Sequence, residues 1–368
     1  MGFGGGRFAR GFELRNYHVE LDDLIGKCGE WARGTGPESD VVMSSRIRLA
    51  RNLTDTPFPP RADDRTKRDV VHLLREKIVE FSPVSLPGYF PVQEMPKLDR
   101  TFLMERQLIS RELSEAKGPR GVFIGANESV SLMLNEEDHL RMQGLRSGYD
   151  LNDCWHEINR IDDELQRGLS FAFNDELGYL TSCPTNAGTG IRVSVMLHMP
   201  AMVMTKEMQK VFQSMHTMGL AVRGLYGEGS QAMGDFYQIS NQTTLGKSEE
   251  QIISKVQQVI PEVLGYERKA RADLLKEFRP KLHDQVSRAL GTLSSARQIS
   301  SEEAMQHLSQ VRLGIAVELL HDVSLKKVNE LFMLIQPAHL QKLHHASLDK
   351  PERDNLRADY LREQLHSN

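Results

Sequence analysis

The sequence is poor in cysteine and contains no long apolar segment. Its three cysteines, Cys28, Cys154 and Cys183, are scattered and form neither a CxxC pair nor a disulfide framework. We therefore expect a reduced, cytoplasmic protein. No segment approaches the roughly 18 consecutive apolar residues that a membrane-spanning helix needs. The N-terminus lacks the apolar stretch of a signal peptide.

An excess of positive charge is also missing. The chain has 46 lysines and arginines against 50 aspartates and glutamates, which gives a net charge of −4. This balance argues against direct binding to nucleic acid or to an anionic membrane. The remaining composition, with 39% hydrophobic and 26% charged residues in a chain of 368, predicts a globular protein of about two domains.

A phosphate-binding P-loop is absent as well. The segment "LGKS" at 245–248 fits the end of that motif, but the first glycine would have to stand at the position of Asn241. A nucleotide site in this protein would therefore need other phosphate ligands.

The predicted secondary structure changes near residue 265. From 38 to 246 strand patterns dominate, and short turns join neighbouring strands. This arrangement predicts an α+β domain, a largely antiparallel sheet with helices packed on it. Helices are predicted within this part at residues 64–81, 137–146, 153–168 and 205–218.

Beyond residue 249 only helical periodicity remains. Helices are predicted there from Ser300 and from Ser324, each begun by a capping residue, with Pro337 ending the second. We assign residues 1–36 to a loosely ordered lead-in with a short helix around 19–33, 37–265 to the α+β domain, and 266–368 to an all-helical C-terminal domain.

Arginines are the candidate phosphate ligands. The strand period of two in "SSRIR" places Ser44, Arg46 and Arg48 on one face and Ser45, Ile47 and Leu49 on the other. Two guanidiniums about 7 Å apart suit a polyanion, although one such pair alone is more typical of a solvated, salt-bridged strand face. Similar settings recur at Arg141, Arg192 and Arg223. Since arginine rather than lysine makes bidentate contacts with phosphate, this repetition favours a nucleoside triphosphate site.

Acidic residues provide the complementary charge. Glu137 in "NEEDH" and Glu228 in "GEGS" can hold a cationic substrate opposite an arginine-bound phosphate chain. The alternative is that Glu136, Glu137 and Asp138 cap a following helix through its dipole.

Four segments together resemble the phosphagen (guanidino) kinase family, in particular its bacterial protein-arginine kinase branch. They are "SSRIRLARN", "NEEDHLR", "SCPTNAGTGIR" and "RGLYGEGS", in this order. The segment "RDNLRA" at 353–358 fits the RDxxRA motif of that branch. The chain also lacks the long all-helical N-terminal domain of the small-molecule kinases.

The resemblance implies a glutamine-synthetase-like catalytic fold, ATP with Mg²⁺ held mainly by the nucleotide phosphates, and no metal site on the protein. It implies phosphorylation of exposed arginines in protein substrates and a homodimer formed through the C-terminal domain. It further implies that phosphoarginine marks proteins for an AAA+ protease system, that an activator protein is a partner, and that phosphoarginine is an allosteric ligand.

The resemblance also implies residue roles. The catalytic residues would be Glu137, Glu228, Cys183, Arg141 and Arg192. The ATP-binding residues would be Ser44, Ser45, Arg46, Ile47, Arg48, Gln107, Arg141, Arg192, Val193, Ser194, Val195, Met196, Arg223, Gly224, Leu225, Tyr226, Gly227 and Glu228. Gln107 replaces a histidine that the family usually has near the adenine, and we expect altered nucleotide affinity from it. The allosteric phosphoarginine site would comprise Arg353, Asp354, Arg357 and Ala358.

Cys183 is interpreted as a thiolate that helps to place the substrate cation. Phosphoryl transfer depends mostly on positioning and charge neutralisation, so no covalent nucleophile is required. The pKa of the thiol would be lowered by nearby positive charge; the alternative is a buried, inert thiol. Gly188 and Gly190 would let the backbone approach the substrate or the phosphates.

The C-terminal motif is predicted to lie on a helix that begins near Pro351. That helix would place Arg353 and Arg357 one turn apart on one face, with Asp354 beside them. This trio can contact both ends of a phosphoarginine, whereas a solvated helix with charged residues is the alternative. Two other functions stay open: a small-molecule guanidino kinase, and a catalytically silent phosphoarginine-binding adaptor.

Overall fold

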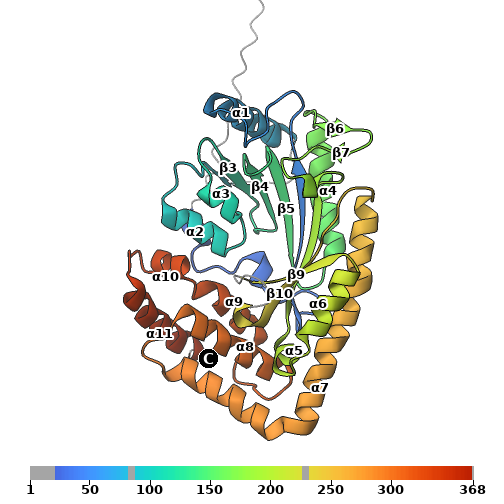
Figure 1. Ribbon diagram of the computed structural model, residues 1–368. Helices are drawn as coiled ribbons and strands as arrows, with labels where there is room; N and C mark the ends of the chain where they lie inside the picture. The colour runs from blue at the N-terminus through green and yellow to red at the C-terminus, as the bar shows by residue number, and fades with distance from the viewer. Residues whose placement is uncertain (1–20, 82–87, 226–231, 367–368) are drawn as a thin grey trace, which may run out of the picture.

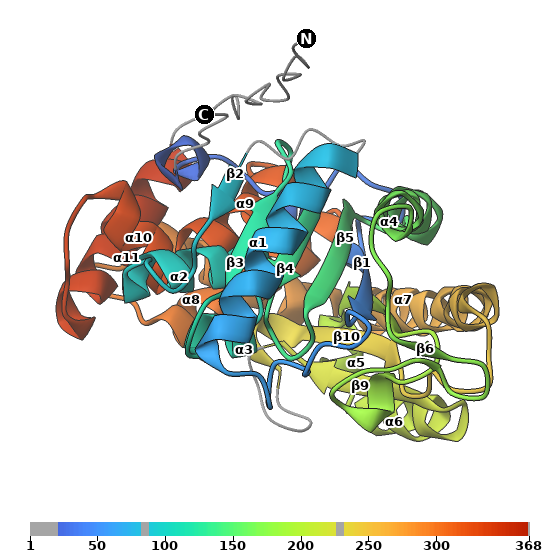
Figure 2. The same cartoon turned by 90° about the horizontal axis from the view of Figure 1, so that it is seen from above.

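The computed structural model describes residues 21–81, 88–225 and 232–366. Its centre is an eight-stranded, wholly antiparallel sheet in the order β2-β3-β4-β5-β1-β8-β10-β9 (Figures 1 and 2). The strands are β1 (Val42–Arg51), β2 (Gly88–Phe90), β3 (Gly121–Ile124), β4 (Val130–Leu134), β5 (Leu140–Ser147), β8 (Ile191–His198), β9 (Leu220–Gly224) and β10 (Phe236–Asn241). A separate hairpin pairs β6 (Phe173–Asn174) with β7 (Gly178–Tyr179).

Helices cover the sheet and continue into the C-terminal part. The α+β part contains α1 (Asp64–Phe81), α2 (Lys97–Glu105), α3 (Arg111–Glu115), α4 (Leu151–Gln166), α5 (Pro200–Met204) and α6 (Met208–Thr217). The C-terminal part contains α7 (Glu249–Ser295), α8 (Ser301–Ala316), α9 (Leu325–Leu334), α10 (Pro337–Leu343) and α11 (Lys350–His366). None of the helices in the described ranges is long and apolar enough to cross a membrane.

Helix α4 illustrates how the sequence pattern builds the core. Its buried residues Leu151, Cys154, Ile158, Ile161 and Leu165 recur at helical spacing and pack onto β1 and β5. Asp150 caps the helix by accepting a hydrogen bond from the N–H of Asp153. The predicted helix at 153–168 is thereby confirmed, with its start two residues earlier.

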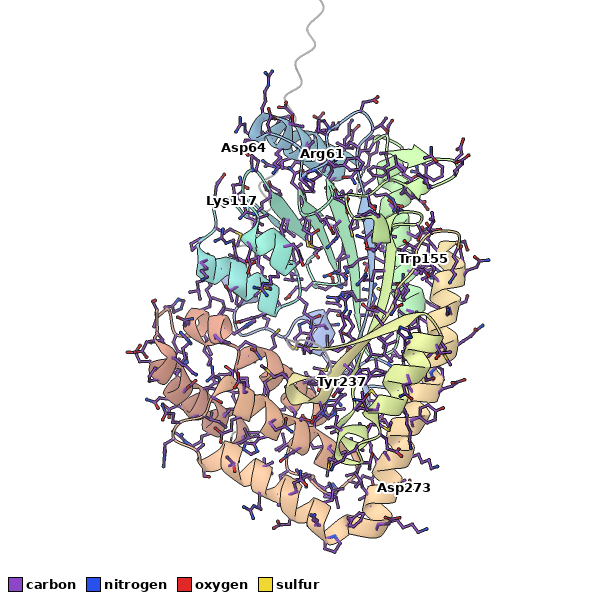
Figure 3. All side chains as sticks on the ribbon, viewed as in Figure 1. Arg61, Asp64, Lys117, Trp155, Tyr237 and Asp273 are labelled. Atoms are coloured by element: carbon purple, nitrogen blue, oxygen red, sulfur yellow. The ribbon has the colours of Figure 1, made fainter. Side chains whose placement is uncertain are left out.

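The far end of the sheet is covered in the same way. Helix α6 packs on β9. Tyr237 of β10 (labelled in Figure 3) meets the ring of Phe212 of α6 at a centroid distance of 6.0 Å. The buried apolar side chains form a large cluster between the sheet and most of its helices and a smaller one beneath α2 and α3, and this packing holds the site in place.

The predicted helix at 137–146 is wrong. These residues form a tight turn and then β5, which pairs with β4 on one side and with β1 on the other. Asn135 adopts a φ of 54° in the turn, and its N–H donates to the carbonyl of His139. The acidic residues that follow Asn135 therefore cap no helix. The short helix expected around 19–33 is likewise replaced, within the described residues, by two 3-10 turns at Leu21–Leu24 and Glu30–Ala32.

Helix α7 connects the two parts of the chain. It begins with a capping box between Ser248 and Gln251 and changes direction at Phe278, whose φ of −133° is not helical (Figure 1). Pro280 lies just beyond this kink and removes a helical hydrogen bond. The predicted domain boundary at 265/266 falls inside α7. The helices predicted from Ser300 and Ser324 are confirmed as α8 and α9.

Candidate active site

A cleft of about 290 Å³ lies beside the central strands and collects most of the predicted catalytic residues. It is lined by Arg48, Leu49, Ala50, Glu112, Glu137, Arg141, Cys183, Thr185, Asn186, Gly190, Arg192 and Arg223. Four of the five predicted catalytic residues are in this set. The fifth, Glu228, lies outside the described residues, as do Tyr226 and Gly227.

The arginines of the cleft come from neighbouring strands. Arg48 of β1 lies directly opposite Arg192 of β8, while Arg141 of β5 lies opposite Ala50. Side chains paired in this way across antiparallel strands lie roughly 5 Å apart at Cβ. Within the described residues, no hydrogen bond or ion pair engages the guanidiniums of Arg48, Arg192 or Arg223.

The electrostatics of this cluster favour an anion. Burial, together with the positive charges of Arg46, Arg141 and Arg192, lowers the pKa of Arg48 well below its usual value. Burial and the charges of Arg223 and Arg141 lower the pKa of Arg192 in the same direction. Like charges held together on a rigid sheet repel one another, and a polyanion relieves that repulsion. The residues therefore fit a nucleotide phosphate chain.

The acidic side of the cleft is the turn between β4 and β5. Arg141 donates from Nη1 to Glu136 at 2.6 Å and from Nη2 to Glu137 at 3.0 Å. Glu136 is buried, whereas the Glu137 side chain is 36% exposed and lines the cleft. Burial raises the pKa of Glu137, and the nearby Arg141 acts in the opposite direction. A carboxylate with a raised pKa is a better proton acceptor, as a general base requires.

Cys183 lies at the start of the 3-10 turn Pro184–Asn186, in the loop between β7 and β8. Its Sγ is 3.0 Å from Oγ1 of Thr185, and both residues line the cleft. The side chain is half-buried and lines the cleft, so the thiol is not fully buried. Its predicted ionisation as a thiolate stays a prediction.

The glycines of this loop serve contacts within the protein. Gly188 has a φ of 105°, and a Cβ there would lie 2.6 Å from the carbonyl oxygen of Thr244. Gly190 has a φ of 65°, and a Cβ there would lie 2.6 Å from the carbonyl oxygen of Ala50. Gly190 also lines the cleft and Gly188 does not, so an approach of the backbone to substrate stays a prediction for Gly190. Both glycines let the loop pack against β1 and the segment before α7.

Two buried side chains that were not among the predicted site residues, those of Asp138 and Arg51, hold the loop in place. Oδ1 of Asp138 accepts hydrogen bonds from Nδ2 of Asn52 and from the N–H of Ser182, both at 2.7 Å. It thereby ties the Glu137 turn to the residue before Cys183. Arg51 pairs with Asp162 at 2.6 Å and donates to the carbonyl of Thr189 at 2.9 Å. Successive side chains of a strand point to opposite faces, so Arg51 lies on the face opposite to that of Arg46 and Arg48. This alternation in the sequence could have predicted that Arg51 faces the core.

The predicted ATP-binding residues are distributed unevenly. Arg46 is near the cleft but donates to Oε1 of Gln238 at 2.6 Å and is not part of the lining. Gln107 adopts a φ of 60°, and its carbonyl accepts from Gln143, which stands opposite Arg48. The buried Nε2 of Gln107 has no partner among the described residues. The remaining predicted residues do not line the cleft: Ser44, Ser45, Ile47, Val193, Ser194, Val195, Met196, Gly224 and Leu225.

The C-terminal motif is helical, as predicted, but its two arginines do not share an open face. Arg357 is 1% exposed and donates to the carbonyls of Ile335 and Ile299 and to Asp354. Ala358 is fully buried. Arg353 is half-buried and donates to the carbonyl of Leu348 at 2.7 Å. In this structure the Arg357 guanidinium is bonded to protein oxygens, so the paired arginine grip stays a prediction.

Comparison with known proteins matches both parts of the chain. The model of "ATP:guanido phosphotransferase, C-terminal catalytic domain" matches residues 69–270. The chain belongs to this family. The model of "Protein-arginine kinase McsB C-terminal domain" matches residues 279–368, so the α7 kink at Phe278 falls between the two matches. The protein is thus an enzyme of the guanidino phosphotransferase class, and the resemblance read from the four segments is confirmed.

Curated relatives extend over almost the whole chain. A protein-arginine kinase of Halothermothrix orenii is 44% identical over 349 residues, 95% of this chain and 100% of the relative. A protein-arginine kinase of Symbiobacterium thermophilum is 45% identical over 348 residues, 94% of this chain and 99% of the relative.

Solved structures confirm the predicted fold. Lombricine kinase matches with a TM-score of 0.56 and 22% identity, over 67% of this chain and 72% of that chain. The duplicated taurocyamine kinase from Schistosoma mansoni also matches with a TM-score of 0.56 and 22% identity, over 78% of this chain and 41% of that chain. At this level of identity the likeness concerns the fold.

Proposed function

We propose that this protein transfers the γ-phosphoryl group of ATP to arginine side chains of proteins. The observation that carries the proposal is a cleft lined both by Arg48, Arg192 and Arg223 and by Glu137. The arginines suit a triphosphate and the carboxylate suits a guanidinium, so the two substrates meet in one place. The names of the curated relatives and the match of the C-terminal part support a protein as the acceptor.

The chemistry follows from this arrangement. A guanidinium nitrogen attacks the γ-phosphorus, and the bond from this phosphorus to the β–γ bridging oxygen breaks, so that ADP leaves. A guanidinium has a pKa above about 12, so it must lose a proton to a placed base as the new N–P bond forms. Glu137 accepts this proton, with Glu228 as the second candidate. The arginines stabilise the charge that develops on the transferred group and on ADP.

Arg141 has a particular part in substrate binding. It is bound to both Glu136 and Glu137, and its guanidinium is the same chemical group as the substrate. The incoming arginine takes the place of Arg141 on Glu137, while Glu136 retains Arg141. Arg141 is then free to turn one edge toward the phosphates.

Magnesium is expected with the nucleotide. Among the described residues no group of three or more histidine, cysteine or acidic side chains forms a metal cluster. A magnesium ion bound with ATP would be held mainly by the nucleotide phosphates and would neutralise part of their charge.

The finer biological role is part of the same proposal. Phosphoarginine marks substrates for an AAA+ protease system in the cytoplasm, an activator protein stimulates the enzyme, and the C-terminal domain forms a homodimer. Phosphoarginine binds as an allosteric ligand at Arg353 and Asp354, with Arg357 and Ala358 as the buried support of that segment. The match of residues 279–368 to the protein-arginine kinase C-terminal domain supports this part.

One assay separates this proposal from its alternatives. The protein is incubated with ATP and either free arginine or an arginine-rich protein, and acid-labile phosphate is measured. Incorporation into protein supports the proposal, whereas incorporation into free arginine alone makes the enzyme a small-molecule guanidino kinase. No incorporation in either arm leaves a silent binding protein. Glu137→Gln should lower the rate by about two to four orders of magnitude, while Glu80→Gln on the exposed face of α1 should not.

A further inference from the structure

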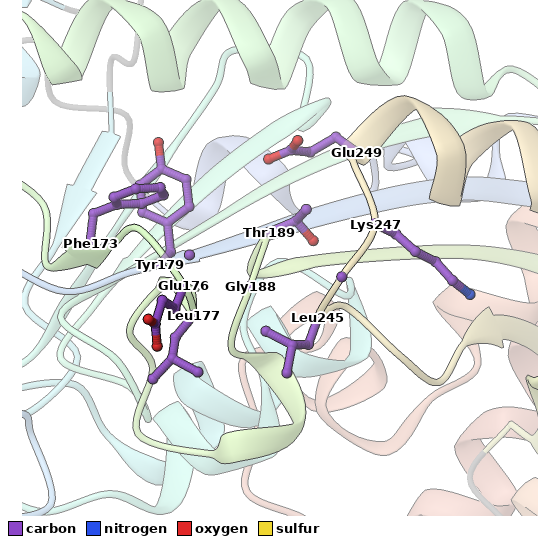
Figure 4. A pocket seen from close by; sticks show the side chains of 11 residues that line it. Phe173, Glu176, Leu177, Tyr179, Gly188, Thr189, Leu245, Lys247 and Glu249 are labelled. Carbon is purple, nitrogen blue, oxygen red and sulfur yellow. The ribbon is translucent and has the colours of Figure 1, made fainter.

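A second pocket lies next to the cleft, on the other side of the Cys183 loop. It has a volume of about 210 Å³ and is formed by the β6–β7 hairpin, the loop before β8 and the start of α7 (Figure 4). Three large apolar side chains at this pocket face solvent: Phe173 is 57% exposed, Leu177 48% and Leu245 51%. We call these three residues the apolar rim. A cavity of about 150 Å³ can hold a benzene ring, so this pocket can accept one large apolar side chain.

The pocket is preformed by local contacts. Oδ1 of Asn174 accepts hydrogen bonds from the N–H groups of Glu176 and Leu177, at 2.9 and 3.0 Å, and so fixes the hairpin turn. The ring of Phe173 packs edge-on against Tyr179 at a centroid distance of 5.2 Å. A preformed apolar surface loses little conformational entropy when a ligand binds.

The hairpin is held against the catalytic loop. The backbone N–H and carbonyl groups of Tyr179 and Gly188 exchange hydrogen bonds of 2.7 and 3.2 Å. Gly178 has a φ of 72°, and a Cβ there would lie 2.5 Å from the carbonyl oxygen of Gly188. The apolar rim and the catalytic loop therefore form one rigid unit.

The loop before β8 contributes residues to both cavities. Cys183 and Gly190 line the cleft, whereas Gly188 and Thr189 line the pocket. Since an extended chain advances about 3.3 Å per residue, a polypeptide with its arginine in the cleft reaches the pocket within a few residues.

The charges around the pocket favour a basic segment. Glu176 and Glu249 are part of its lining, and the carboxylate of Glu249 points toward the aromatic pair (Figure 4). The side chain of Lys247 runs away from that pair, with Nζ 3.5 Å from Oγ1 of Thr243 (Figure 4). The side of the pocket near the hairpin is therefore acidic and apolar.

The geometry points to this pocket as a docking site for the protein substrate. It takes a large apolar side chain from an extended, basic segment, a few residues away from the arginine that is phosphorylated. The inference rests on the proposed function and adds to it a preference for the sequence around the target arginine. Apolar residues near arginines are accessible in unfolded or extended segments, so such segments are the substrates it selects.

A peptide series tests the docking site. Each peptide carries one target arginine and one phenylalanine, which is moved stepwise through the positions on either side. We expect a narrow range of positions at which phenylalanine lowers KM by about tenfold relative to alanine, with kcat little changed. Binding of fluorescent versions of the same peptides without ATP should show the same preference.

Variants of the rim identify the pocket. Leu177→Ser combined with Leu245→Ser should remove the preference and leave the phosphorylation of the phenylalanine-free peptide unchanged. Tyr266→Ser is the matched control, because Tyr266 is 49% exposed on α7 and lies 17 residues beyond Glu249, about 25 Å along the helix. Glu176→Lys should weaken only the peptides with additional basic residues.

The outcomes separate this inference from the proposed function. Peptides phosphorylated with no positional preference, or a preference that survives the double substitution, would overturn the docking site. A double substitution that changes the oligomeric state and not the peptide preference would also overturn it, since the rim would then be an interface between copies of the chain. Binding through the rim without phosphorylation of any peptide would refute the proposed function and leave the docking site in place.

Discussion

The arginines that line the cleft differ in their partners from the buried arginines outside it, which we call the scaffold arginines. Among the largest fully buried side chains of the described residues are four arginines, Arg51, Arg106, Arg312 and Arg357. Each of them donates to carboxylate or carbonyl oxygens of the protein. In the cleft, Arg48 and Arg192 instead face each other and further arginines.

This difference in partners indicates which arginines contribute to stability and which to ligand binding. A buried arginine whose donors are all bonded to protein oxygens stabilises the fold, because its removal leaves buried acceptors without a donor. Arginines that repel one another destabilise the folded protein until an anion binds. Their presence in the cleft is therefore explained by ligand binding, as strained and clustered groups at active sites generally are.

The largest expected effect concerns the cleft. Arg192→Lys keeps the charge but removes the bidentate donor geometry. We expect kcat/KM to fall by about 10²- to 10³-fold, with an unchanged or slightly higher melting temperature. The exposed Arg160 of α4 offers the control, and Arg160→Lys should change neither quantity. Wild-type kinetics in Arg192→Lys would place this arginine with ordinary surface residues.

The scaffold should respond in the opposite way. Arg51→Met leaves Asp162 buried without its cation, and we expect the free energy of unfolding to fall by about 3–5 kcal/mol. Urea unfolding measures this loss. Because Arg51 also holds Thr189, the activity of the folded fraction should fall, but by less than in Arg192→Lys. If Arg51→Met is as stable as the wild type but loses more activity than Arg192→Lys, Arg51 acts in the site and not in the scaffold.

The C-terminal motif allows the comparison to be made within one helix. Arg357→Met leaves Asp354 and two backbone carbonyls without a donor, which should destabilise the protein by about 2–3 kcal/mol. Arg353→Ala should change stability by less than about 1 kcal/mol. Under the proposed allosteric role it should weaken the binding of a phosphoarginine peptide, measured by calorimetry in a Glu137→Gln background. Equal peptide affinity with and without Arg353→Ala would place the regulatory site elsewhere.

The smallest expected effect is on pH dependence. Burial raises the pKa of Glu137 above that of an ordinary glutamate. Below this raised pKa, kcat/KM should decline by about tenfold for each pH unit, because the general base becomes protonated. Folding favours the protonated form of a carboxyl with a raised pKa, so this group's contribution to stability is lost as the pH rises through that pKa. Protonation of Glu137 therefore does not unfold the protein, and the loss of activity at low pH cannot be explained by such unfolding.

A variant tests whether the decline of kcat/KM at low pH, the acidic limb of the profile, belongs to Glu137. Arg141 lowers the pKa of Glu137, so Arg141→Gln should move the limb of the residual activity to higher pH. A limb at the same pH in both proteins would assign it to another group.

Much of the fold follows from local patterns. The alternation in β1 predicts that Arg46 and Arg48 share a face, and the helical spacing in α4, α8 and α9 predicts these helices within a few residues. The segment 137–146 shows where local patterns fail. Its apolar spacing is compatible with a helix, but pairing with the neighbouring β4 and with β1, about 90 residues earlier, makes residues 140–147 a strand.

The sequence by itself determined the α+β and helical parts, the family, and which residue types could bind phosphate and guanidinium. Only the tertiary structure decided which arginines line the cleft. Arg48 and Arg51 are three residues apart on one strand, yet Arg51 meets Asp162, 111 positions away, and Arg48 meets Arg192. Arg357 likewise donates to carbonyls 22 and 58 positions away. The role of a guanidinium is set by the oxygens within its reach, and long-range folding, not local sequence, brings those oxygens there.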